Sequence, residues 1–217
     1  MKFFFNRSKP KINSPALTEN EKTLSDSLNI YEELAIGIKL KTNNSIEPLY
    51  ELRWGDEEGN EEKPKLKGIR SLVSHKLSVP DMLQHVKELQ LDNRFFGYHI
   101  FSCGHFGSDK DYFIGAIKTN DQYECLRVFE TNGINYNIET NDIINFFKRW
   151  ESKMRFSIID AYHDRVIIQL KDYNFEIDKF IEEMLEFCPD FYAAVEDVKE
   201  MKKYIYDRKG EIDFWWD

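Results

Sequence analysis

The sequence predicts an α+β protein. Three observations support this class: apolar residues recur at helical spacing, strand-like runs cluster after residue 94, and 41% hydrophobic residues accompany 32% charged ones. We expect an N-terminal mixed helix and strand region over residues 1–93, packed on a C-terminal domain over residues 94–217. The C-terminal half is predicted to form a ferredoxin-like split βαβ sheet with an added helix.

The first predicted helix covers residues 18–34. Thr18 and Glu21 have the spacing of a capping box, in which each side chain accepts a backbone N–H of the other residue. Leucine and tyrosine side chains at helical spacing supply an apolar face. Gly37 is predicted to end this helix.

The next elements are a strand, a loop and a second helix. Apolar and charged residues alternate over residues 50–54, as in a half-buried strand. Residues 55–65 are acidic, contain glycine and lack any period, so we expect a solvated loop. A helix is predicted over residues 79–90, because Ser78 is a good N-cap and Pro80 suits the first turn.

Strand-like runs follow over residues 95–103, 112–119 and 123–131. The last two are separated only by residues 120–122, which include Asn and Asp, and this predicts a hairpin. A strong helix is predicted over residues 140–154, capped by Thr140 or Asn141. Its buried face is expected to contain Ile143, Phe146, Phe147 and Trp150.

The remaining chain predicts two strands, two helices and a last strand. The strands cover residues 156–162 and 165–171 and are joined by a turn at His163 and Asp164. The helices and the last strand are expected at 176–187, 192–207 and 211–216. Termini fray unless they are held, so the aromatic end predicts a strand that pairs in the sheet, with Trp215 and Trp216 covered on opposite faces.

The C-terminal half contains three motifs: the run "TNGINYNIETNDIINFFKRWESKMRFSIIDAYHDRVIIQL" at residues 131–170, "EFCPD" at residues 186–190 and "FWWD" at the end. Together they resemble the bacterial domain of unknown function 4253 family. The resemblance covers roughly the last 100 residues and implies no activity. The chain departs from the family at residues 162–164, where members carry a Gly-Phe-Asp turn. It departs again after residue 190, where members carry a loop rich in Gln, Gly and Thr.

The charge distribution favours a basic partner. The net charge is -9, and after Lys171 acidic residues outnumber basic ones by more than two to one. A field of this sign repels nucleic acid, which needs clustered Lys and Arg. No apolar run reaches the roughly 20 residues that span a bilayer, so no membrane partner is predicted. Three cysteines without paired spacing agree with a cytoplasmic location.

Two groups could carry chemistry. His99, Cys103 and His105 alternate on a predicted strand and could face one side, but a zinc site needs a fourth ligand that the sequence does not place. His163 beside Asp164 could be an acid–base pair, although a turn role for this pair is the stronger interpretation. We therefore predict no metal, no cofactor and no catalytic residue.

The sequence predicts a non-catalytic protein-binding module, and more sharply an immunity-type protein that occludes a toxin encoded by a neighbouring gene. Aromatic residues among acidic ones suit docking on a basic protein surface. The predicted contact residues are Asp190, Phe191, Tyr192, Glu196, Asp197 and Glu200. The alternative is a small hydrolase-like enzyme that uses His163 or the His99, Cys103 and His105 group.

Overall fold

A seven-stranded sheet runs through the molecule. The computed structural model describes residues 16–51, 64–74, 77–104, 111–192 and 197–216. The strand order is β1-β2-β4-β3-β5-β6-β7, with bounds β1 Ile46–Tyr50, β2 Leu66–Leu72, β3 Tyr98–Gly104, β4 Tyr112–Lys118, β5 Phe156–Tyr162, β6 Arg165–Leu170 and β7 Glu211–Trp215. Within these residues no helix is long and apolar enough to cross a membrane.

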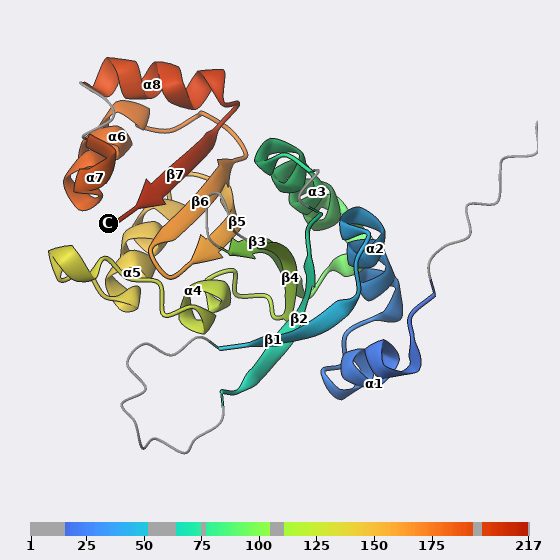
Figure 1. Ribbon diagram of the computed structural model, residues 1–217. Helices are drawn as coiled ribbons and strands as arrows, with labels where there is room; N and C mark the ends of the chain where they lie inside the picture. Colours follow the sequence, from blue (N-terminus) through green and yellow to red (C-terminus); the bar gives the residue numbers. More distant parts are fainter. Residues whose placement is uncertain (1–15, 52–63, 75–76, 105–110, 193–196, 217) are drawn as a thin grey trace, which may run out of the picture.

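Helices cover both faces of the sheet (Figure 1). Helices α1 (Glu19–Ser27), α2 (Glu32–Thr42) and α3 (Val79–Leu91) share one apolar core with the sheet. The opposite core is built with α4 (Glu124–Val128), α5 (Thr140–Glu151), α6 (Ile177–Phe187), α7 (Pro189–Tyr192) and α8 (Val198–Asp207). Two short 3-10 turns, η1 (Asn93–Phe95) and η2 (Ile134–Tyr136), complete the described elements.

Neighbouring strand residues contribute to opposite cores because side chains alternate along a strand. Ile100 packs with α1 to α3, while Phe101 packs with α4 to α8. In β6, Ile167 lies in the core with α1 to α3 and Ile168 lies in the core with α4 to α8. The α+β class is confirmed, and the molecule has three layers with the sheet in the middle.

The N-terminal helix of the prediction is two helices. The capping box of Thr18 and Glu21 is present, but α1 ends at Ser27 and the chain turns through Asn29, whose φ is 52°. Asparagine tolerates this left-handed backbone better than most residues. Gly37 was expected to end a helix, but it lies inside α2. There a Cβ would sit 3.4 Å from the Leu89 side chain of α3, which is an ordinary van der Waals contact.

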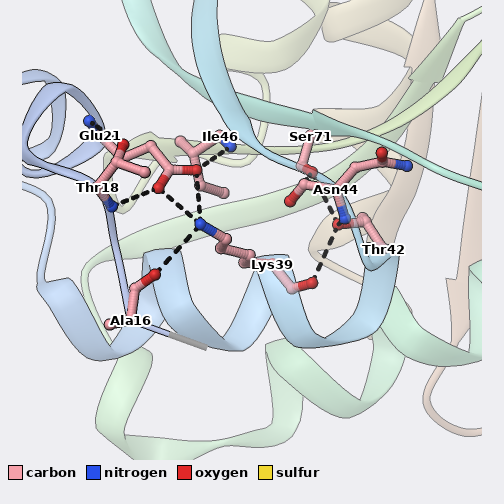
Figure 2. A network of polar contacts seen from close by, with 8 residues as sticks. All are labelled: Ala16, Thr18, Glu21, Lys39, Thr42, Asn44, Ile46 and Ser71. Atoms are coloured by element: carbon pink, nitrogen blue, oxygen red, sulfur yellow. Dashed lines mark hydrogen bonds and ion pairs between the residues drawn. The ribbon is translucent and has the colours of Figure 1, made fainter. Parts of the chain in front are cut away.

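A buried carboxylate joins these first elements (Figure 2). Glu21 is only 4% exposed. Its carboxylate accepts hydrogen bonds from the Thr18 N–H at 2.7 Å, the Lys39 ammonium at 2.7 Å and the Ile46 N–H at 2.8 Å. Burial opposes its charge, but these donors outweigh burial and lower the pKa of Glu21 to about 2. One side chain thus connects α1, α2 and the start of β1.

Two parts of the C-terminal prediction are wrong. Residues 123–131 were expected to be a hairpin strand but contain helix α4, so the ferredoxin-like order is not formed. Instead β5, β6 and β7 are consecutive antiparallel neighbours. The cap of α5 is Glu139, which precedes the two expected residues. The predicted buried face of α5 is confirmed.

Strand β2 was not predicted. It pairs with β1 on one side and with β4 on the other. The sheet is therefore continuous across the boundary predicted at residue 93. Part of the strand expected at residues 50–54 lies outside the described residues.

The last strand is confirmed, and it forms the end of the sheet beside β6. Only one tryptophan of the pair is covered: Trp216 is 3% exposed and Trp215 is 43% exposed. The Trp216 indole donates to the Phe187 carbonyl at 3.1 Å. On the outer side of β7, the Cys188 thiol donates to the carbonyl of Trp215 at 3.0 Å and accepts its N–H at 3.2 Å.

Candidate functional site

The sheet opens between its two central strands. β3 and β5 are parallel neighbours, and their described ladder consists of the pair Ser102 and Asp160. Nearer the starts of the two strands, side chains form hydrogen bonds with the backbone. The Gln90 side-chain amide of α3 donates to the carbonyls of Ile100 at 2.6 Å and Ile158 at 2.8 Å. The Gln122 side-chain carbonyl accepts the N–H of Ile158 at 3.0 Å. Two glutamines thus satisfy backbone groups that a closed sheet would pair.

A pocket of about 570 Å³ lies beside this opening. We call it the polar pocket, because most of its lining carries hydrogen-bonding groups. Its residues come from α3, the starts of β3 and β5, the turn before α4, and α5. The lining consists of Gln90, Tyr98, His99, Asn120, Asp121, Gln122, Tyr123, Lys148, Glu151, Phe156 and Ser157.

Two carboxylates and one ammonium set the charge of the polar pocket. Glu151 accepts hydrogen bonds from the Gln122 amide at 2.9 Å and the Tyr123 hydroxyl at 3.0 Å. Burial opposes the charge of Asp121, but the Tyr123 N–H and the Arg127 guanidinium outweigh burial and lower the pKa of that carboxyl. The Lys148 ammonium lies 5.6 Å from the centre of the Tyr123 ring. The lining therefore carries one more negative charge than positive.

His99 is the buried titratable group of the polar pocket. It is 7% exposed and stacks on Phe101, with ring centroids 5.4 Å apart. Burial lowers its pKa to about 4, against the opposing effect of the Asp121 carboxylate, so the imidazole is neutral at pH 7. Among the described residues, neither its Nε2 nor the Oε1 of Gln90 has a hydrogen-bond partner. Two buried polar atoms at this site are thus unsatisfied.

Two further hollows follow one after the other from the polar pocket. A smaller one of about 230 Å³ surrounds η1 and shares Gln90, His99 and Gln122 with it. A groove of about 520 Å³ between α2 and α3 continues from there through Asp92 and Phe95. Large apolar side chains are exposed beside them: Phe96 at 84%, Leu91 at 71% and Leu40 at 48%. We call the three hollows with these side chains the η1 surface.

The predicted metal-like group is not a reactive site within the described residues. His99 and Cys103 lie on the same face of β3, but His105 falls outside the described residues. Burial raises the pKa of the Cys103 thiol to about 12. Among the described residues, no three His, Cys, Asp or Glu side chains are placed to hold a metal ion.

His163 and Asp164 form the turn between β5 and β6, as predicted. The His163 Nε2 is 3.6 Å from the Asp164 carboxylate. The carbonyl of His163 accepts the N–H of Asn132 at 2.7 Å. These contacts give the pair a structural role at the hairpin end.

Of the predicted contact residues that the structure describes, Asp197 and Glu200 are exposed and Phe191 is buried. Phe191 is 8% exposed and packs against the Tyr204 ring, so it presents little surface to a partner. Asp190 accepts a hydrogen bond from the Tyr136 hydroxyl. Asp197 caps α8 by accepting the N–H of Glu200 at 2.8 Å. The Tyr192 side chain and Glu196 lie outside the described residues.

Gln90, Gln122 and Phe96 are site residues that the sequence patterns do not predict. The glutamines carry no signal, because a polar residue on an amphipathic helix is ordinarily solvated. A signal for Phe96 exists in the run "RFFGY". On the strand expected there, consecutive side chains would point to opposite faces, and in the structure Phe95 is buried while Phe96 is exposed.

Comparison with known proteins identifies one family. Residues 113–217 match the family model described as domain of unknown function (DUF4253). The match begins within β4 and contains α4 to β7. It agrees with the resemblance of the C-terminal half. No curated protein and no solved structure matches the chain significantly.

Proposed function

Because the family that the C-terminal half matches has no assigned function, we propose a function from the surface of the molecule. The protein is a non-catalytic module that binds a basic partner protein through the η1 surface. In its sharper form, the proposal is an immunity-type role in the cytoplasm, in which the partner is a toxin encoded by a neighbouring gene.

The exposed Phe96 side chain carries this proposal. It is 84% exposed and lines the smaller hollow, which leaves room for partner side chains. Large aromatics surrounded by such hollows anchor protein interfaces, and exposed apolar groups rimmed by polar ones mark interaction sites. Leu91 and Leu40 extend the apolar area along α3 and α2.

Charge supports a basic partner. The charged residues that line the three hollows are five acidic ones and three basic ones: Glu33, Glu88, Asp92, Asp121, Glu151, Lys41, Arg94 and Lys148. The whole chain carries -9. Complementary charge speeds encounter and suppresses wrong partners.

The enzyme alternative has less support. A thiol nucleophile needs a lowered pKa, whereas burial raises the pKa of Cys103 to about 12 and that of Cys188 to about 11. A histidine base works best with a pKa near the operating pH, and the pKa of His99 is about 4. These values favour binding over catalysis.

The test is a binding and growth experiment with Phe96→Asp. Products of the adjacent genes are expressed alone and with this protein. We expect one of these products to be a basic protein that is toxic when expressed alone. Co-expression with the wild-type protein should restore growth. Phe96→Asp should lose at least about tenfold in affinity, since loss of a central aromatic anchor costs about 2 kcal/mol or more.

The matched control is Ile134→Asp. Ile134 is 78% exposed and lies in η2, outside the η1 surface, so this change should leave binding unchanged. Glu200→Lys tests the surface first expected from the sequence. An acidic partner, or equal binding by wild type and Phe96→Asp, would contradict the proposal.

A further inference from the structure

We infer that the polar pocket binds the guanidinium group of an arginine side chain. This inference rests on the proposed function, since the arginine belongs to the basic partner protein. The pocket adjoins the hollow lined by Phe96, so a side chain from a partner docked there can enter it.

Within the described part of the chain, two acceptor atoms that line the polar pocket lack a hydrogen-bond donor. Gln90 Oε1 is an acceptor without a partner, and the Nε2 of a neutral His99 accepts when Nδ1 carries the proton. Asp121 and Glu151 add carboxylate oxygens with remaining lone pairs. A buried acceptor left unpaired costs free energy, and a ligand that donates to it recovers this cost.

A guanidinium fits this set better than other groups. It offers five N–H donors in one plane and no acceptor, and it keeps its charge at any pH the protein tolerates. Tyr98, which is partly exposed, lines the pocket, and planar cations stack on aromatic rings. A carboxylate or phosphate would add acceptors to acceptors.

Lys148 allows a test of whether the bound group is positively charged. Its ammonium lines the pocket and contacts the Tyr123 ring, so it occupies the region that a second cation would enter. Its side chain is exposed, and removing it should not disturb the core. Lys148→Ala should therefore tighten binding of a guanidinium, whereas Glu151→Gln should weaken it.

The experiment titrates the whole protein with N-acetyl-L-arginine methylamide and monitors backbone and side-chain amide resonances. The neutral isostere N-acetyl-L-citrulline methylamide is the comparison ligand. We expect saturable shifts at Gln90 and Gln122 with the arginine probe, and at least tenfold weaker binding of the citrulline probe. Glu151→Gln should weaken the arginine probe about fivefold and Lys148→Ala should tighten it about threefold. Glu186→Gln, an exposed carboxylate of α6, is the control.

Equal binding of both probes, or no shift at the two glutamines, would overturn the inference. The proposed function can fail separately. If the arginine probe binds as expected but no adjacent gene product binds, the pocket stands without the proposed partner. If a partner binds through Phe96 but the probe does not, the partner uses the η1 surface without an arginine in this pocket.

Discussion

At the scale of single residues, the least expected feature is His99. The sequence places it in a possible metal group with Cys103, because both residue types bind zinc and their spacing puts them on one strand face. The structure confirms the shared face but buries both side chains. Residue types alone could not reveal burial, since burial follows from helices that pack on the strand from far along the chain.

Burial of neutral His99 predicts acid-sensitive stability. Its pKa falls from 6.5 in the unfolded chain to about 4 in the folded one, so the unfolded state binds more protons between these values. The contribution of neutral His99 to the free energy of unfolding should therefore be complete above pH 6.5 and decrease as the pH falls towards 4. Between pH 7.5 and 5 the loss from this residue is about 2 kcal/mol.

Urea denaturation of wild type and His99→Phe at both pH values measures this loss. Phenylalanine keeps a ring that can stack on Phe101 and does not titrate. The variant should lose less stability than wild type over the same interval. Parallel pH profiles would show that His99 does not titrate in this way.

At the scale of elements, one polar side chain can decide how helices and strands join. The capping box of Thr18 and Glu21 is readable from spacing, and it is formed. The same carboxylate also holds Lys39 and Ile46, which no local pattern predicts because they lie 18 and 25 residues away. Local rules therefore identify where α1 begins but not what it joins.

Glu21→Ala should destabilise the protein by about 3 kcal/mol, because it leaves the Lys39 ammonium in a largely buried place without its carboxylate. The control is Glu19→Ala in the same helix turn. The Glu19 side chain is 92% exposed and pairs with Lys22, so its loss should cost less than about 0.5 kcal/mol. Thermal denaturation of both variants measures the difference. Similar losses would show that the Figure 2 contacts contribute little.

The α4 segment shows why some elements were mispredicted. Its apolar residues Cys125, Leu126, Val128 and Phe129 fit helical spacing, but the run is short and rich in residues that favour strands. A helix of five residues is too short to be stable by itself and depends on packing. In the structure these side chains are buried in the core that α5 shares.

At the scale of the whole molecule, the two halves share one sheet. The sequence suggested a boundary near residue 93, and the family match begins at residue 113, but β2 pairs with β4 across that boundary. The family match covers only residues from 113 onwards, whereas one apolar core combines residues from both halves of the chain. Among the described residues, the helices that cover one apolar face of the C-terminal strands all come from the N-terminal half.

A fragment of residues 94–217 should not fold cooperatively alone. Without α1 to α3 it would expose Ile100, Ile114, Ile159 and Ile167, each of which is 2% exposed or less in the whole protein. Full burial of each such side chain contributes about 2 kcal/mol, which together is comparable with the stability of a domain. Gel filtration and thermal denaturation of the fragment measure this. A sharp transition from a monomer would contradict the prediction.

The contact between Cys188 and Trp215 has a consequence for how molecules of this protein meet. The outer edge of a terminal strand can recruit a strand of another molecule and start a polymer. At Trp215 both outward-facing backbone groups are already occupied by the thiol. A hydrophobic side chain of similar size could cover this edge but could not form hydrogen bonds with the N–H and carbonyl of Trp215. The thiol therefore helps to keep crowded copies of the protein from joining sheet to sheet.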